Sequence, residues 1–118
     1  MTEEDHYRPE QTALCGCFNA PYNFLVNEKE LGMDDKYAVV SLLICSVCGQ
    51  VWLRYFYEIE AFTASGRWYL GAIQAEQAAF MTVEHAKAAL ESLDSYFYGG
   101  SYYGGQSGSS SGQIYLNP

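Results

Sequence analysis

The four cysteines of this 118-residue chain lie in two close pairs, C-x-C at Cys15 and Cys17 and C-x-x-C at Cys45 and Cys48. In a reducing compartment, such pairs are typical of metal ligands rather than of disulfides. Zn²⁺ takes four ligands in a tetrahedron, with each thiolate sulfur at roughly 2.3 Å. Folding around zinc contributes an apparent ~10–16 kcal/mol. This equals or exceeds the net stability of a small domain. We therefore expect all four cysteines to bind one zinc ion.

The second pair is followed by glycine, in the segment Cys45-Ser46-Val47-Cys48-Gly49-Gln50. This segment resembles the zinc-ribbon and rubredoxin-type knuckle, C-x-x-C-G-x, and the resemblance covers only the knuckle and the strand after it. It implies that both sulfurs face one metal from a tight turn at the tip of a β-hairpin, with backbone N–H groups aimed at them. Gly49 is expected to relieve that turn.

The first pair departs from the zinc-ribbon pattern, because zinc ribbons usually show C-x-x-C twice. Gly16 makes the tighter C-x-C spacing feasible. His6 is the alternative fourth ligand if Cys15 or Cys17 does not reach the metal. Iron also accepts four thiolates, but we expect zinc. Its role would be structural, because four protein thiolates leave no open coordination position.

Three apolar segments predict the strands of a small antiparallel sheet. Residues 37–45 form a nearly continuous apolar run, whose length fits a strand buried on both faces. Residues 51–62 alternate with a period of two, and residues 67–74 return after a hairpin loop at 63–66. A fourth strand is a candidate at residues 22–26, and the charged residues 27–36 are expected to be a loop.

A helix is predicted from about residue 82 to 97, because apolar residues recur there at helical spacing. We therefore expect an α+β fold: a zinc-ribbon-like sheet of three to four strands with one C-terminal covering helix. Residues 1–97 are expected to form a single zinc-stabilised domain, of which 1–13 are a polar lead-in. Residues 98–118 are expected to form a Gly/Ser/Tyr-rich tail that is partly packed or flexible.

The hairpin loop also predicts which side chains share a face. If Phe62 lies opposite Arg67, then Arg67 and Tyr69 join one face of residues 51–62, and Arg54 and Arg67 lie near two glutamates on that face. This face carries the candidate partner contacts, which are Trp52, Phe56, Glu58, Glu60 and Tyr69.

The charge balance favours a protein partner of basic character. The chain has 14 acidic and 6 basic residues, for a net charge of −8, and 16% of its residues are aromatic. Nucleic-acid readers carry clustered Lys and Arg, so we expect no nucleic-acid partner. An acidic, aromatic surface attracts a basic protein and buries its own rings on binding. We therefore expect a non-enzymatic interaction module, and a bacterial immunity protein or antitoxin is one analogy.

Two other functions remain open. Rubredoxin-like iron electron carriers are also small, acidic and aromatic, although they lack the predicted helix. A structural subunit or homodimer would use the strand edges and exposed tyrosines in a symmetric interface.

Motifs for catalysis and membrane insertion are absent from the sequence. No apolar run approaches the ~20 residues of a membrane span, and the acidic N-terminus does not resemble a signal peptide. We therefore expect a cytoplasmic protein with no membrane partner. His85 stands beside Glu84 on the predicted helix and is interpreted as part of a solvated face. With no nucleophile or metalloprotease motif, we expect no enzyme activity.

Overall fold

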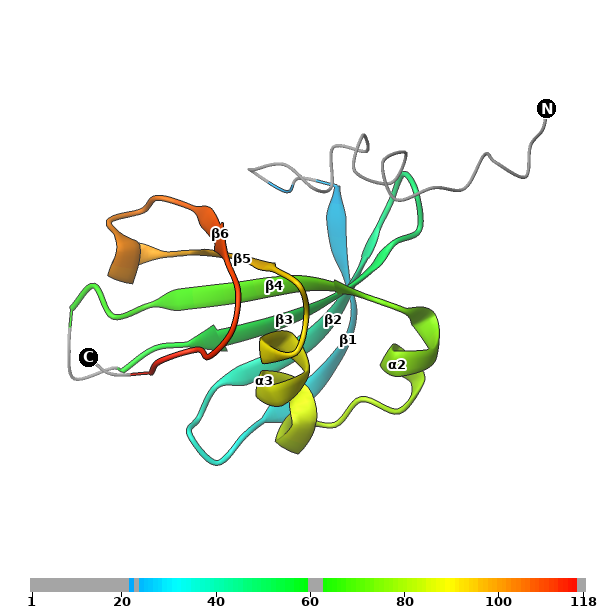
Figure 1. Cartoon of the computed structure of the whole chain (residues 1–118), viewed down its shortest axis with the longest axis horizontal. Helices are drawn as coiled ribbons and strands as arrows, with labels where there is room; N and C mark the ends of the chain where they lie inside the picture. The colour runs from blue at the N-terminus through cyan, green and yellow to red at the C-terminus, as the bar shows by residue number, and fades with distance from the viewer. Residues whose placement is uncertain (1–21, 23, 60–62, 117–118) are drawn as a thin grey trace.

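The structure, a computed structural model, describes Tyr22, residues 24–59 and residues 63–116. Within these residues the chain forms a six-stranded antiparallel sheet whose strands follow one another in chain order (Figure 1). The strands are β1 (Leu25–Met33), β2 (Val39–Cys45), β3 (Val51–Tyr57), β4 (Arg67–Ile73), β5 (Tyr96–Gly99) and β6 (Gly108–Ser110). Two short α-helices, α2 (Ala75–Ala79) and α3 (Val83–Glu91), follow β4, and the 3-10 helix Ser101–Tyr103 links β5 to β6.

This architecture corrects the expected fold, which was a zinc-ribbon-like sheet of three to four strands with one C-terminal covering helix. The first reason is β1, most of which we expected to be a loop. Its register against β2 shifts between Asn27 and Lys29 and again between Glu30 and Gly32. These bulges interrupt the alternation that identifies a strand in sequence, and they protect a charged, solvent-facing edge from further pairing.

The second correction concerns the hairpin of β3 and β4. Tyr57 lies opposite Arg67, whereas the sequence placed Phe62 there. The connection between the two strands is therefore longer than predicted, because β3 ends at Tyr57, and the shift of five residues moves every β4 side chain to the other face of the sheet. Ser65 fastens this longer loop, because its hydroxyl accepts from the Ile59 N–H (2.9 Å) and donates to the Ile59 carbonyl oxygen (2.7 Å).

The third correction is the helix predicted from about 82 to 97, because α3 ends at Glu91 and residues Tyr96–Gly99 form β5. Leu93 and Phe97 continue the helical spacing in the sequence, but their side chains pack on opposite faces of the sheet. A Cβ on Gly71 of β4 would lie 2.4 Å from Leu93 Cδ1, so this leucine packs tightly over the strand on the α3 side. The Phe97 ring lies on the opposite face, 5.4 Å from the Tyr22 ring.

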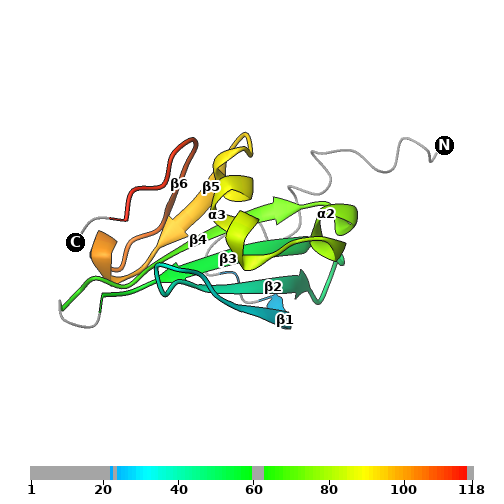
Figure 2. The same ribbon diagram turned by 90° about the horizontal axis from the view of Figure 1, so that it is seen from below.

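The sheet is buried on both faces. We call the side covered by α3 the helix face (Figure 2). Its buried residues are Ala38, Val40, Leu42, Leu53, Tyr55, Tyr69, Ile73, Ala86, Leu90, Tyr96 and Ile114. The opposite face buries Leu43, Cys45, Trp52 and Leu70, packed with Tyr22, Leu25, Trp68, Ala72 and Phe97. Because the central strands bury side chains on both faces, they appear as continuous apolar runs in the sequence.

The segment after α3 contributes to the helix-face core. Ile114 is only 2% exposed. Its backbone N–H donates to Glu91 Oε2 (2.8 Å), and the Tyr96 hydroxyl donates to the Gly112 carbonyl oxygen (2.9 Å). Partial burial alone would raise the pKa of Glu91, but hydrogen bonds from Lys87 and from the Ile114 N–H outweigh it and hold the pKa below its usual value. Residues 108–116 are thus anchored on α3 and β5.

None of the helices in the described ranges is long and apolar enough to cross a membrane.

Two neighbouring residues test whether the C-terminal segment is part of the core. Ile114→Ala should lower the free energy of unfolding by ~2–5 kcal/mol, because it leaves a cavity under the segment. Tyr115 is 67% exposed, so Tyr115→Ala should change it by about 0.5 kcal/mol or less. Urea unfolding of both variants measures the difference. Equal stabilities for the two variants would show that the segment does not pack.

Candidate functional site

The turn between β2 and β3 carries Cys45, which is buried, and Cys48, which is exposed. The backbone N–H groups of Val47 and Cys48 donate to Cys45 Sγ at 3.3 and 3.4 Å. The Gly49 N–H donates to the Cys45 carbonyl oxygen (3.0 Å), and Gly49 has a φ of +81°, which favours glycine. Backbone N–H groups aimed at the sulfur are the arrangement expected of a zinc knuckle, in which cysteine binds the metal as a thiolate. We call residues 45–50 the knuckle.

The knuckle supplies two of the four predicted zinc ligands. The other two, Cys15 and Cys17, and the alternative ligand His6 lie outside the described residues. Among the residues that the structure describes, no group of three or more His, Cys, Asp or Glu side chains is arranged to hold a metal ion. The two sulfurs of the knuckle are donors of the soft type that zinc accepts.

The five predicted partner contacts do not share one exposed face. Trp52 is fully buried and Tyr69 is 3% exposed, so neither presents its ring to a partner. The corrected register places Tyr69 on the helix face, opposite Tyr55. Phe56 is half-buried and Glu58 is exposed, while Glu60 lies outside the described residues.

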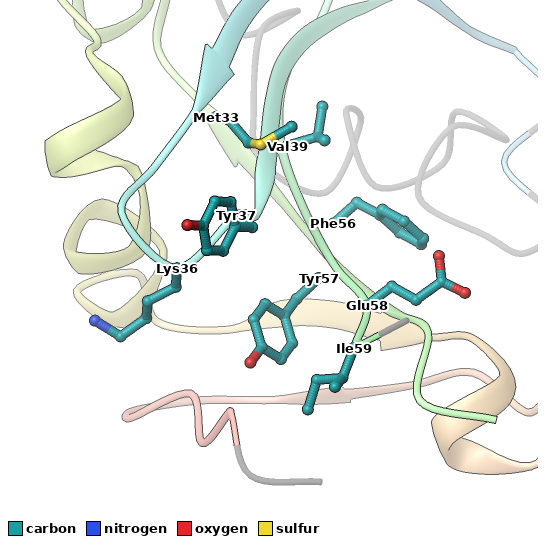
Figure 3. A pocket seen from close by; sticks show the side chains of 8 residues that line it. All are labelled: Met33, Lys36, Tyr37, Val39, Phe56, Tyr57, Glu58 and Ile59. Carbon is teal, nitrogen blue, oxygen red and sulfur yellow. The ribbon is translucent and has the colours of Figure 1, made fainter. Parts of the chain in front are cut away.

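Phe56 and Glu58 line a groove of about 490 Å³ at the end of the sheet away from the knuckle (Figure 3). One part of its lining comes from the end of β1, the β1–β2 turn and the start of β2, and the other part comes from the end of β3 and the two residues after it. We call it the end groove, and it is lined by Met33, Lys36, Tyr37, Val39, Phe56, Tyr57, Glu58 and Ile59.

Asp34 holds the turn that presents Tyr37 to the end groove. Its Oδ1 accepts hydrogen bonds from the backbone N–H groups of Lys36 and Ala38, both at 2.9 Å, and its Oδ2 accepts from the Tyr55 hydroxyl. Burial, this hydrogen bond and the charge of Asp34 raise the pKa of Tyr55 far above its usual value. In the turn, Tyr37 has a φ of +67° and is 76% exposed. The ring of Tyr37 is thus held in solvent by a backbone conformation that tyrosine rarely adopts.

The two arginines that we expected near Glu58 and Glu60 lie on different faces. Arg54 is on the opposite face, where burial lowers the pKa of its guanidinium, and it lies 5.3 Å from the centre of the Phe56 ring. Arg67 is fully buried between two rings, 3.5 Å from the centre of Tyr102 and 5.3 Å from the centre of Tyr57. Both cations therefore contact aromatic faces.

Sequence reasoning missed Met33, Lys36 and Tyr37 because they fall in or beside the charged segment that we interpreted as a loop. The Asp34-Asp35 pair was one reason for that interpretation, and Asp34 does hold a turn, because it accepts from backbone N–H groups two and four residues ahead. The positive φ of Tyr37 had no signal in the sequence.

His85 lies in the first turn of α3, where it is exposed and its Nδ1 is 2.7 Å from Thr82 Oγ1. The contact joins His85 to the residue that precedes the helix, three positions earlier in the chain.

Comparison of the chain with protein-family models, curated proteins and solved structures found no match. The knuckle and the end groove are therefore the features from which we infer a function.

The backbone strain at Tyr37 can be measured. Tyr37→Gly should raise the free energy of unfolding by up to about 1 kcal/mol, because relief of roughly 1–2 kcal/mol of left-handed strain exceeds the roughly 0.4–1 kcal/mol that the freedom of glycine in the unfolded chain costs. The neighbouring Lys36 does not have a positive φ. Lys36→Gly relieves no strain and should lower stability by roughly 0.4–1 kcal/mol, because glycine gives the unfolded chain more freedom. Thermal and urea unfolding give both values. A loss of stability in Tyr37→Gly would mean that the turn stores no strain.

Proposed function

We propose that this chain is a non-enzymatic protein-interaction module that binds a basic protein partner in the end groove and is stabilised by zinc at the knuckle. The observation that carries the proposal is the end groove itself. It combines two exposed apolar side chains, Met33 (57%) and Tyr37 (76%), with the exposed carboxylate of Glu58. Exposed side chains of this size beside a charged rim are typical of a surface that a partner covers.

The chemistry of the end groove suits a lysine or arginine side chain of the partner. These side chains have an apolar stem that packs along apolar walls and a cationic head that needs a carboxylate. Tyr37 and Met33 supply such walls, and Glu58 supplies the carboxylate. In Figure 3 the Lys36 ammonium points away from Glu58, so it does not occupy the place of the partner's cation.

Charge around the end groove favours the same kind of partner. Lys36 Nζ lies 3.9 Å from Asp35 Oδ1, so its positive charge has an acidic neighbour. Asp34 and Glu58 add two more acidic groups around the groove, and the chain carries a net charge of −8. This field would steer a basic protein toward the groove. An immunity protein or antitoxin that blocks a basic toxin is one version of this proposal.

The knuckle supports the zinc part of the proposal. Cys45 Sγ accepts two backbone hydrogen bonds, as a metal-binding thiolate does in the knuckles that this segment resembles. Zinc bound by Cys45 and Cys48, and completed by Cys15 and Cys17, would hold the β2–β3 hairpin to the N-terminal part of the chain. A cytoplasmic location fits this role, because reduced thiols are available to a metal there.

Cys48→Ser tests the zinc site more sharply than Cys45→Ser, because Cys48 is exposed. A substitution that breaks contacts other than a metal bond typically costs ~0.5–3 kcal/mol. A zinc ligand would cost a large share of the apparent ~10–16 kcal/mol of binding. We therefore expect Cys48→Ser to lose zinc in elemental analysis and to unfold the domain at room temperature.

Ser46→Ala is the matched control in the same turn, and it should keep both zinc and stability. Wild-type metal content and melting temperature in Cys48→Ser would contradict the site. A visible absorption band from thiolate-bound iron would instead favour the rubredoxin-like alternative.

The partner class can be tested by selecting random peptides that bind the full chain from a displayed library. The selected peptides should be rich in Arg and Lys. Glu58→Gln should weaken their binding about tenfold, because it removes the acceptor of a charge-assisted hydrogen bond. Tyr37→Ala should weaken it by a similar factor, and added salt should weaken binding to the wild type more than to Glu58→Gln.

Tyr115→Ala is the control for this experiment, because Tyr115 is as exposed as a contact residue but lies outside the end groove. Selection of neutral or acidic peptides, or equal binding by all variants, would overturn the proposed partner class.

A further inference from the structure

A second cavity, of about 430 Å³, lies at the other edge of the sheet, beside β5 and β6. We call it the tyrosine pocket. Six tyrosines line it, namely Tyr69, Tyr96, Tyr98, Tyr102, Tyr103 and Tyr115, of which Tyr69 and Tyr96 are each only 3% exposed. Ser110, Ser111, Gln113 and Ile114 complete the lining. We propose that the tyrosine pocket binds a neutral saccharide. This site shares no lining residue with the end groove and does not depend on the proposed partner.

The tyrosine rings of the pocket pack against one another. Tyr103 lies at the centre, with ring-centre distances of 4.5 Å to Tyr98, 5.0 Å to Tyr102 and 6.5 Å to Tyr69. The hydroxyl oxygens of Tyr69 and Tyr103 are also hydrogen-bonded at 2.8 Å. Ring pairs of this kind are stabilising in themselves. The aromatic surface is therefore preorganised before any ligand arrives, which lowers the cost of binding.

The backbone of β6 is shaped to accept one of these rings. A Cβ on Gly108 would lie 2.7 Å from the Tyr98 hydroxyl oxygen and 2.9 Å from its Cζ. A larger residue at this position would force the end of the Tyr98 side chain to move. Gly108 therefore helps to fix one wall of the pocket.

The lining of the pocket favours a neutral ligand. None of the lining residues is acidic or basic, and residues 95–116 contain no charged side chain. No lining residue offers a carboxylate to a cation, and the neighbouring carboxylate of Glu91 already accepts hydrogen bonds from Lys87 and from the Ile114 N–H. An anion would find no cation in the lining and would approach a chain of net charge −8. Burying an unpaired charge is costly, so a neutral ligand is favoured.

The lining has the two kinds of surface that a sugar ring requires. A pyranose presents C–H groups on its faces, which pack on aromatic rings, and hydroxyl groups on its rim, which exchange hydrogen bonds. Tyrosine and serine hydroxyls both donate and accept, and a glutamine amide does both as well. Ser110, Ser111 and Gln113 are exposed, so their polar groups are accessible at the mouth of the pocket. The volume is within the range of small-molecule sites.

The test is binding of the full chain to an array of glycans that end in neutral hexoses or N-acetylhexosamines, with uronic-acid glycans beside them. The methyl glycoside of the best neutral sugar is then titrated by calorimetry. We expect neutral sugars to bind and uronic acids not to bind. Tyr115→Ala, which removes an exposed ring of the pocket, should weaken binding about tenfold. Gly108→Ala should also weaken it by displacing Tyr98.

Tyr37→Ala is the matched control, because it removes an exposed tyrosine from the end groove and should leave sugar binding unchanged. The proposal is overturned if no neutral glycan binds, if only uronic-acid glycans bind, or if Tyr37→Ala weakens binding as much as Tyr115→Ala. Tyr115 lines the tyrosine pocket and not the end groove, and Tyr37 lines the end groove and not the tyrosine pocket. The sugar-binding and peptide-binding experiments can therefore fail independently, so failure of this inference is distinguishable from failure of the proposed function.

Discussion

The register of β3 against β4 determines which side chains reach each face of the sheet. Tyr55 lies opposite Tyr69, so both rings enter the core under α3, while Trp52 and Trp68 lie on the opposite face. The same register sends Arg67 to the helix face, where its guanidinium lies between Tyr57 and Tyr102. A slip of one residue would exchange the two faces, so the core, the end groove and the tyrosine pocket all depend on this pairing.

The knuckle and the end groove lie at opposite ends of the same hairpin. β2 runs from Val39, which lines the groove, to Cys45, whose sulfur accepts the hydrogen bonds of the knuckle. A strand of this length spans roughly 20 Å. A metal at the knuckle would therefore act on the groove only through the stability of the strands. The proposed zinc and the proposed partner site are physically separate parts of one element.

The central strands could be predicted from the sequence because their burial leaves a strong apolar signal. The strand predicted over residues 37–45 is confirmed as β2, and the return strand predicted to begin at residue 67 is confirmed as β4. The hairpin turn at Cys45–Gln50 was also predicted, because C-x-x-C-G demands a tight turn between two apolar runs. These features depend on residues that are close together in the chain.

The features that could not be predicted depend on individual contacts. The length of the β3–β4 loop is set by Ser65, whose hydroxyl bonds to Ile59 across the loop. The end of α3 follows from the position of Phe97, which belongs to the opposite face rather than to a longer helix. The end groove forms only where the turn at Tyr37 meets the end of β3. None of these contacts leaves a periodic pattern in the sequence.

The order of the strands has a consequence for how the chain reaches this structure. Every strand pairs with its neighbour in the chain, so most pairings close short loops and lose little chain entropy. The widest separation, residues 74–95 between β4 and β5, contains both α2 and α3. Sheets with such local connectivity have a low contact order for an all-antiparallel topology, and low contact order is associated with rapid folding. The meander can therefore assemble one hairpin at a time.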